Sequence, residues 1–201
     1  MNKLISVLVA VMCSQAVSAD LPKFADDKDA DAWLRATSPF YHQMTKVVDG
    51  RGSYQFRSWD QSGGCVHHEN GTRFILMNPN LKGAERVSIL IFEISNAYQE
   101  PKHNEIDQPA RTGAIKDAEI FAVRHELIEY DGLRYHRDVL AEIEKAVGGI
   151  PREMLTWINP PLTTLDSYLL PLAHDYLEAQ HRGGHTDHYR KYFPTRQAEK
   201  P

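Results

Sequence analysis

One helix-like segment, residues 88–97, constrains the fold of this chain more than any other feature. Its apolar residues recur with a period near four, so residues 82–99 are predicted to form a largely buried helix of about four turns. Glu93 and Asn96 interrupt this apolar helix, and their spacing of three residues places both side chains on one face. A carboxylate is costly in such surroundings unless it is paired, hydrogen-bonded or bound to a metal. Glu93 is therefore a candidate functional residue, with a structural hydrogen bond or salt bridge as the alternative.

A second group of candidates lies on a later helix. Residues 114–147 have helical periodicity and end at Gly148-Gly149. If the two helices pack together, the carboxylates of this segment form a stripe that faces Glu93, although a solvated acidic face gives the same pattern. The imidazole of His125 lies next to apolar positions of the same segment. At such a position a buried core histidine is the alternative to a metal ligand. The polar side chains concerned are Glu119, His125, Glu126 and Glu129.

Together the two helices resemble the active-site region of zincin metallopeptidases. In that family an apolar residue precedes the motif His-Glu-x-x-His, and a small residue often follows it. Glu93 matches the general-base glutamate and Ala97 the small residue, whereas Phe92 and Asn96 stand where the family has its two zinc-binding histidines. The similarity extends over residues 72–147, because a strand precedes the first helix and an acid-rich helix follows it.

The resemblance implies roles for individual residues. Some zincins take their third ligand, a glutamate, from the later helix, and Glu119, Glu126 and Glu129 match that element. The candidates implied for catalysis are Glu93, Asn96 and Glu126, and those for metal binding are Glu119, Glu129 and His125.

The two missing histidines argue against a zinc site of the family's kind. Such a site needs about three protein ligands and an open water position, and neutral imidazoles bind without adding charge. Phe92 has no ligand atom, and Asn96 offers only a weak neutral oxygen. Two alternatives stay open for Glu93 and its neighbours: a harder divalent ion, or a metal-free acid–base pair with one carboxyl pKa raised by burial. No cofactor follows from the sequence alone, and a pseudoenzyme is a further alternative.

The N-terminus has the pattern of a secretory signal peptide. Lys3 precedes an apolar run, and small residues within 16–19 stand at the positions that a signal peptidase reads, so cleavage is predicted after Ala19. The apolar run is too short to span a bilayer core of about 30 Å, so no stable membrane anchor is expected. The mature chain would be periplasmic or secreted. It would hold one cysteine, Cys65, and its fold would depend on a core without an internal disulfide.

The mature chain is predicted to fold as one α+β domain over residues 20–180, followed by a polar tail at residues 181–201. A small antiparallel sheet, with a hairpin at Asn70-Gly71, is expected to precede a mostly helical, zincin-like core. Residues 100–113 are predicted to form a polar loop. The expected helices are 25–48 (one or two), 82–99, 114–147, 151–158 and 164–180, and the expected strands are 53–59, 65–68 and 72–77.

Two other groups of residues compete with the site on the helices. Cys65 lies two residues from His67, as in a thiol–imidazole pair, but a small buried side chain is the usual role of a lone cysteine. His181 and His185 would suit a metal if their segment were helical. Gly183-Gly184 argues against that helix, so a coil with adventitious metal affinity is expected instead.

The net charge of the chain and its predicted export limit the functions that it can have. Removing residues 1–19 takes away one lysine and no acid, leaving 22 basic and 27 acidic side chains and a net charge of −5, so nucleic acid is a poor candidate partner. The first hypothesis is an exported zincin-like metallopeptidase relative that acts on a peptide or cell-wall peptide. The second is a non-enzymatic periplasmic binding or immunity protein that inhibits a cell-envelope toxin. Glu93 in an open pocket would favour the first hypothesis, and a sealed Glu93 the second.

Overall fold

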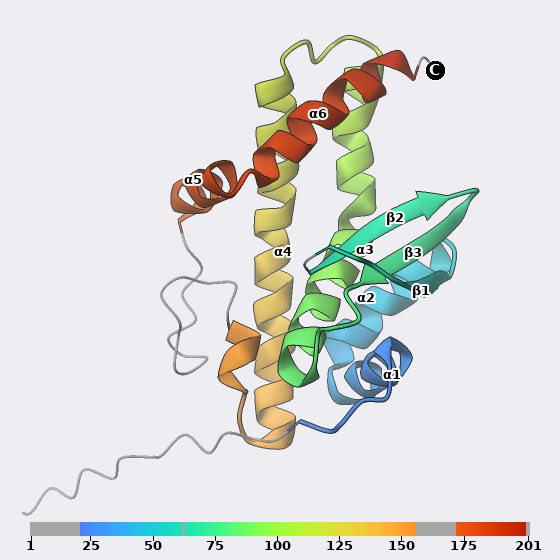
Figure 1. Ribbon diagram of the computed structural model, residues 1–201, viewed down its shortest axis with the longest axis vertical. Helices are drawn as coiled ribbons and strands as arrows, with labels where there is room; N and C mark the ends of the chain where they lie inside the picture. The colour runs from blue at the N-terminus through green and yellow to red at the C-terminus, as the bar shows by residue number, and fades with distance from the viewer. Residues whose placement is uncertain (1–20, 62, 156–171, 200–201) are drawn as a thin grey trace, which may run out of the picture.

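The computed structural model describes residues 21–61, 63–155 and 172–199, and these form an α+β fold (Figure 1). The predicted signal peptide and residues 164–171 of the helix expected at 164–180 lie outside the described residues. In chain order the elements are α1 (Asp27–Thr37), α2 (Pro39–Gly50), β1 (Tyr54–Ser58), β2 (Gly64–Glu69), β3 (Thr72–Met77), α3 (Gly83–Arg111), α4 (Ala118–Val147), the 3-10 helix η1 (Arg152–Leu155), α5 (Ala173–Gly183) and α6 (His185–Ala198).

The sheet is mixed, so the expectation of a purely antiparallel sheet is wrong. Strands β2 and β3 form the predicted antiparallel hairpin, and both turn residues, Asn70 and Gly71, have the positive φ that a type I′ turn requires (51° and 77°). Strand β1 pairs in parallel with the other edge of β3, giving the order β1-β3-β2. Five of the six residues of β3 are buried, so this order places the most apolar strand at the centre of the sheet.

Helices α3 and α4 pack side by side as a long antiparallel hairpin (Figure 1). Gly132 of α4 allows their close approach, because a Cβ there would lie 3.2 Å from Gln99 Nε2 and 3.5 Å from Asn96 Oδ1. Gln99 in turn donates a hydrogen bond to the Ile128 carbonyl at 3.0 Å. Apolar side chains of both helices join α1, α2 and β3 in the main core, among them Leu34, Met44, Ile75, Leu90, Ile94, Leu140 and Ile143.

The polar loop expected at residues 100–113 is wrong, because α3 continues through Pro101 and Pro109 to Arg111. Pro101 has no amide proton for the carbonyl of Ala97, four residues earlier in the helix. Arg51, which follows α2, donates from Nη2 to that carbonyl at 2.8 Å and to the Tyr98 carbonyl at 3.1 Å. A guanidinium from another element therefore replaces the missing donor and allows the helix to continue.

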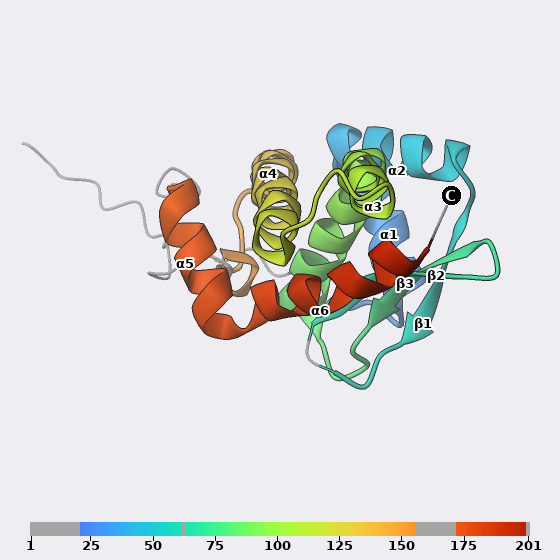
Figure 2. The ribbon, with the colours of Figure 1, turned by 90° about the horizontal axis from the view of Figure 1, so that it is seen from above.

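The coil expected after residue 181 is also wrong. Gly184, with φ of 78°, ends α5 in the left-handed conformation, and α6 begins at the next residue. Figure 2 shows α3 between α2 on one side and α6 with the sheet on the other. Phe193 anchors α6 in a small core with Ala110, Ile115 and Phe121. The helix depends on that anchor and on ion pairs more than on an apolar stripe, which explains why sequence periodicity did not predict it.

Two other expectations concern the ends of the helical region. Residues 25–48 form two helices, as expected, and the Ser38 side chain accepts a hydrogen bond from the Tyr41 amide at the start of the second. Within the helix expected at 151–158, the described part is the short η1. In the part of the chain that the structure describes, none of the helices combines the length and apolar character needed to cross a membrane.

Candidate metal centre

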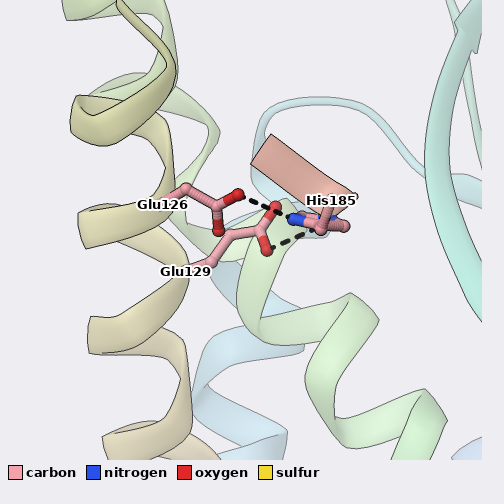
Figure 3. A group of neighbouring side chains, drawn as sticks. All are labelled: Glu126, Glu129 and His185. Carbon is pink, nitrogen blue, oxygen red and sulfur yellow. Dashed lines mark hydrogen bonds and ion pairs between the residues drawn. The ribbon is translucent and has the colours of Figure 1, made fainter. Parts of the chain in front are cut away.

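Three side chains with metal-ligand atoms meet where α4 and α6 pack together (Figure 3). Glu126 and Glu129 are three residues apart on α4, so their carboxylates lie on one face of that helix. His185, the first residue of α6, lies between them: its Nδ1 is 3.0 Å from Glu126 Oε1, and its Nε2 is 3.7 Å from Glu129 Oε2. One ligand atom from each residue lies within 4.8 Å of the other two. A single ion between them would be able to contact all three.

Glu93 joins this group from α3, where it is 5% exposed. Burial, and after it the charge of Glu129, raise the pKa of the Glu93 carboxyl to about 8. The Asn96 amide, hydrogen-bonded to Glu93, and the charge of His185 oppose that rise. Burial likewise raises the pKa of Glu129 to about 7, while His185 lowers it and Glu126 raises it further. We call Glu93, Glu126, Glu129 and His185 the acidic cluster.

Strand β2 covers Glu93 on the side away from α4. A Cβ on Gly64 would lie 2.8 Å from Glu93 Cγ and 3.0 Å from Glu93 Oε1, so only glycine allows this approach. The next residue, Cys65, has its thiol pKa raised to about 11 by burial, then by the charges of Glu93 and Glu129. Its thiol therefore stays protonated at neutral pH, which disfavours the thiolate that a nucleophilic cysteine needs.

Tyr189 of α6 connects the acidic cluster to a second polar group. Its hydroxyl donates a short hydrogen bond to Glu129, and its ring stacks on His125 with centroids 4.7 Å apart. His125 itself interacts with other residues: its Nδ1 is 2.7 Å from His103 Nδ1, and its Nε2 is 3.3 Å from Asp107 Oδ1. His125 therefore lies behind Tyr189, in contact with Asp107 instead of the acidic cluster.

The structure brings some of the sequence candidates together and separates others. Glu93, Asn96, Glu126 and Glu129 lie together, which is one of the two arrangements that the sequence left open. Glu119 is exposed and pairs with Arg190 at 2.6 Å, and His125 belongs to the neighbouring group described above. Sequence reasoning placed His185 in a coil and did not consider Tyr189 for the site. The sequence contains one signal for His185, its spacing of four residues from His181, which would suit a metal site on a helix. The glycine pair between the two histidines argued against a helix, so α6 was not predicted.

The acidic cluster is short of positive charge. It holds three carboxyl groups, 5%, 0% and 6% exposed, against one imidazole. Hydrogen bonding to Glu126 and the nearby charges of Glu129 and Glu93 raise the pKa of His185 to about 9. Glu126 Oε2 is buried and lacks a well-formed hydrogen bond among the described residues, and so does the Tyr176 hydroxyl, although the two side chains lie close enough to interact. Buried charges without partners are costly, so a divalent cation would stabilise this cluster.

The donor set narrows the choice of cation. Two carboxylates and one imidazole suit Zn²⁺ or Mn²⁺ better than a soft, thiolate-seeking ion. Three protein ligands leave room for water, which is the arrangement of catalytic sites.

No protein-family model, curated protein or solved structure matches this chain. The resemblance of its two helices to zincins therefore stays a prediction from the sequence.

Proposed function

We propose that this chain is an exported relative of the zincin metallopeptidases that binds one divalent metal ion through Glu126, Glu129 and His185. The observation that carries the proposal is the convergence of these three side chains, with ligand atoms within 4.8 Å of one another, beside a fourth buried carboxyl group. The ligands replace the two histidines that the family has on its first helix. Export follows from the signal-peptide pattern of residues 1–19.

The proposed reaction is hydrolysis of an amide bond in a peptide or cell-wall peptide. A bound Zn²⁺ or Mn²⁺ ion would supply Lewis acidity toward the carbonyl oxygen and toward water. Glu93 is the general base of this proposal, because its carboxyl group lies beside the proposed ligand Glu129 and a cation bound there would favour its ionised, proton-accepting form. Asn96 is a positioning residue that holds Glu93 through its amide.

Access to this site runs along His185. The His185 side chain is 43% exposed, whereas those of Glu126 and Glu129 are 0% and 8% exposed. Glu93 is sealed by strand β2, so a substrate reaches its carboxylate only when the start of α6 or strand β2 moves outward. Solvent therefore reaches the site at the corner between α5 and α6, and a substrate would approach from the same side.

The burial of Glu93 argues against the hydrolase, because a sealed Glu93 is the outcome expected for the non-enzymatic hypothesis, and it supports a second candidate function. A non-enzymatic periplasmic binding or immunity protein, acting on a cell-envelope toxin, needs no open base, and in such a protein the metal would stabilise the fold. The partner would be a peptide or protein of the cell envelope.

Metal content and hydrolysis separate these functions. Mature protein, residues 20–201, is prepared without a histidine tag or chelator, and metal per chain is measured by mass spectrometry before and after incubation with Zn²⁺ or Mn²⁺. We expect one ion per chain, lost in Glu126→Gln and retained in the matched control Glu119→Gln. Absence of stoichiometric metal after incubation would refute the metal centre.

Glu93→Gln then tests catalysis. We expect this variant to keep its metal and to lose cleavage of a mixed peptide and cell-wall peptide panel by at least a hundredfold, the usual contribution of a general base. A wild-type protein that holds its metal and cleaves nothing would favour the binding protein.

A further inference from the structure

A small hollow lies at the corner formed by α4, α5 and α6. Its volume is about 210 Å³, below the range of roughly 300–1,000 Å³ that whole small-molecule ligands occupy. The hollow is therefore suited to one side chain of a larger molecule. Its lining residues are Glu119, Val123, Leu177, Glu178, His181 and Thr186.

The hollow adjoins the metal centre on both sides. Val123 precedes Glu126 by three residues, so the two side chains share a face of α4. Thr186 follows His185 at the start of α6. Since His185 is the most exposed member of the acidic cluster, the hollow lies beside the route by which a substrate reaches the metal.

The chemistry of the lining favours an aliphatic side chain. Val123 and Leu177 give it an apolar lining. Thr186 contributes a polar atom at the base of the lining: it is 3% exposed, and its buried hydroxyl has no hydrogen-bond partner among the described residues.

Negative charge at the hollow selects against acidic residues. Glu119 and Glu178 both line it, and both are about half exposed. Because Glu119 already pairs with Arg190, Glu178 is the carboxylate that would repel an acidic side chain placed there, whereas a neutral aliphatic side chain would not be repelled.

We propose that this hollow is the specificity pocket of the enzyme, and that it receives an aliphatic side chain, of about the size of leucine, from a peptide substrate. The assignment rests on the proposed function for its substrate class. Leucine has several more carbon atoms than alanine. A pocket that accommodates them favours leucine over alanine by about 10- to 100-fold in kcat/KM or in affinity.

The first test measures binding, and it does not require hydrolysis. Zn²⁺-loaded mature protein is titrated with acetyl-leucine amide, acetyl-alanine amide and acetyl-glutamate amide, and binding is followed by nuclear magnetic resonance of the backbone amides. We expect at least tenfold tighter binding of the leucine compound than of the other two, with the largest shifts at Val123, Leu177 and Thr186. Equal affinities for the three compounds, or shifts located elsewhere, would overturn the pocket.

A pair of variants supports the assignment. Val123→Phe fills the hollow and should abolish the preference for leucine, while Leu127→Phe, on the same helix but outside the hollow, should keep it. Both should retain one metal ion per chain, which shows that they are folded. A leucine preference that persists in Val123→Phe would contradict the pocket. A leucine preference in a protein that cleaves no peptide would instead refute the hydrolase and leave the pocket as part of a binding protein.

Discussion

Two buried polar groups lie along the contact between α6 and the α3–α4 hairpin, and they differ in charge balance. The first is the acidic cluster, with three carboxyl groups and one imidazole. The second, which we call the Asp107 group, consists of Asp107, His103, His125 and Arg196. Its single carboxylate lies 2.9 Å from Arg196 Nε and 3.3 Å from His125 Nε2.

This difference in charge balance indicates a structural role for the Asp107 group and a functional role for the acidic cluster. Burial, followed by the charge of His125, lowers the pKa of His103 to about 3, so His103 is neutral and Arg196 balances the Asp107 carboxylate. Such a group connects α6 to the hairpin through ion pairs, although Asp107 Oδ1, His125 Nε2 and Arg196 Nε each lack a well-formed hydrogen bond among the described residues. The acidic cluster holds three carboxyl groups against one imidazole, and two of its carboxyl pKa values are raised to about 8 and 7, which is typical of sites that bind a ligand or catalyse a reaction.

The largest effect we expect is the pH dependence of the metal-free protein. The folded pKa values of Glu93 and Glu129, about 8 and 7, lie above the usual value of 4.5. Their contribution to stability is therefore complete below about pH 4.5 and is lost as the pH rises to 8. Between pH 5 and pH 8.5 the free energy of unfolding should fall by on the order of 5 kcal/mol. Urea titrations in chelator measure it, and saturating Zn²⁺ should remove most of the decline. A stability that rises over this range would contradict the shared burial of the two carboxyls.

Breaking the Asp107 group should have the next largest effect. Asp107→Ala removes the buried carboxylate that pairs with both Arg196 and His125, and we expect a loss of about 3 kcal/mol of stability. Metal affinity should change less than twofold, because no ligand belongs to this group. Urea unfolding and Zn²⁺ titration of the same preparation measure both. A large loss of metal affinity would show that the two groups are not separable.

Glu126→Gln should have opposite effects on two properties of the acidic cluster. Zn²⁺ affinity should fall by about a hundredfold or more, or about 3 kcal/mol, because a charged ligand is lost. Above pH 9, where His185 is neutral and no ion pair with it is lost, the metal-free protein should become about 1 kcal/mol more stable, because repulsion with Glu129 is removed. Competition titration with a Zn²⁺ indicator and thermal unfolding measure the two effects, with Glu119→Gln as control. A metal-free variant less stable than the wild type in that pH range would mean that Glu126 is a structural residue.

The smallest effect concerns the cover over Glu93. Gly64→Ala places a methyl group against Glu93 Cγ and should cost about 1–2 kcal/mol. Gly50→Ala is the matched control, because a Cβ there has no atom within 4 Å. If the methyl group displaces β2 outward, Glu93 becomes more exposed. The fall in the free energy of unfolding between pH 5 and pH 8.5 should then become smaller. Thermal unfolding at pH 6 and pH 8 checks both, and equal stability of the two variants would indicate a looser contact than the structure shows.

The parts of the molecule that were predicted from sequence are those determined by local patterns. The Asn70-Gly71 turn predicts its hairpin because both residues tolerate positive φ, and the spacing of Glu93 with Asn96 gives their common face. Helix α6 was missed because its neighbours in space, not its own periodicity, stabilise it, through Phe193 and Arg196. His185 was missed with it. The order of the strands likewise depends on which strand occupies the sheet centre, and no local pattern carries that information.

The contact between Arg51 and the Ala97 carbonyl has a consequence for how this sequence can change. Pro101 creates the need for the guanidinium, and Arg51 makes the proline tolerable. The two positions are therefore a compensating pair: loss of Arg51 is harmful while Pro101 is present and nearly silent once Pro101 is alanine. The order in which the two substitutions arise then matters, because an evolving chain passes safely only through the intermediate that has lost the proline and kept the arginine.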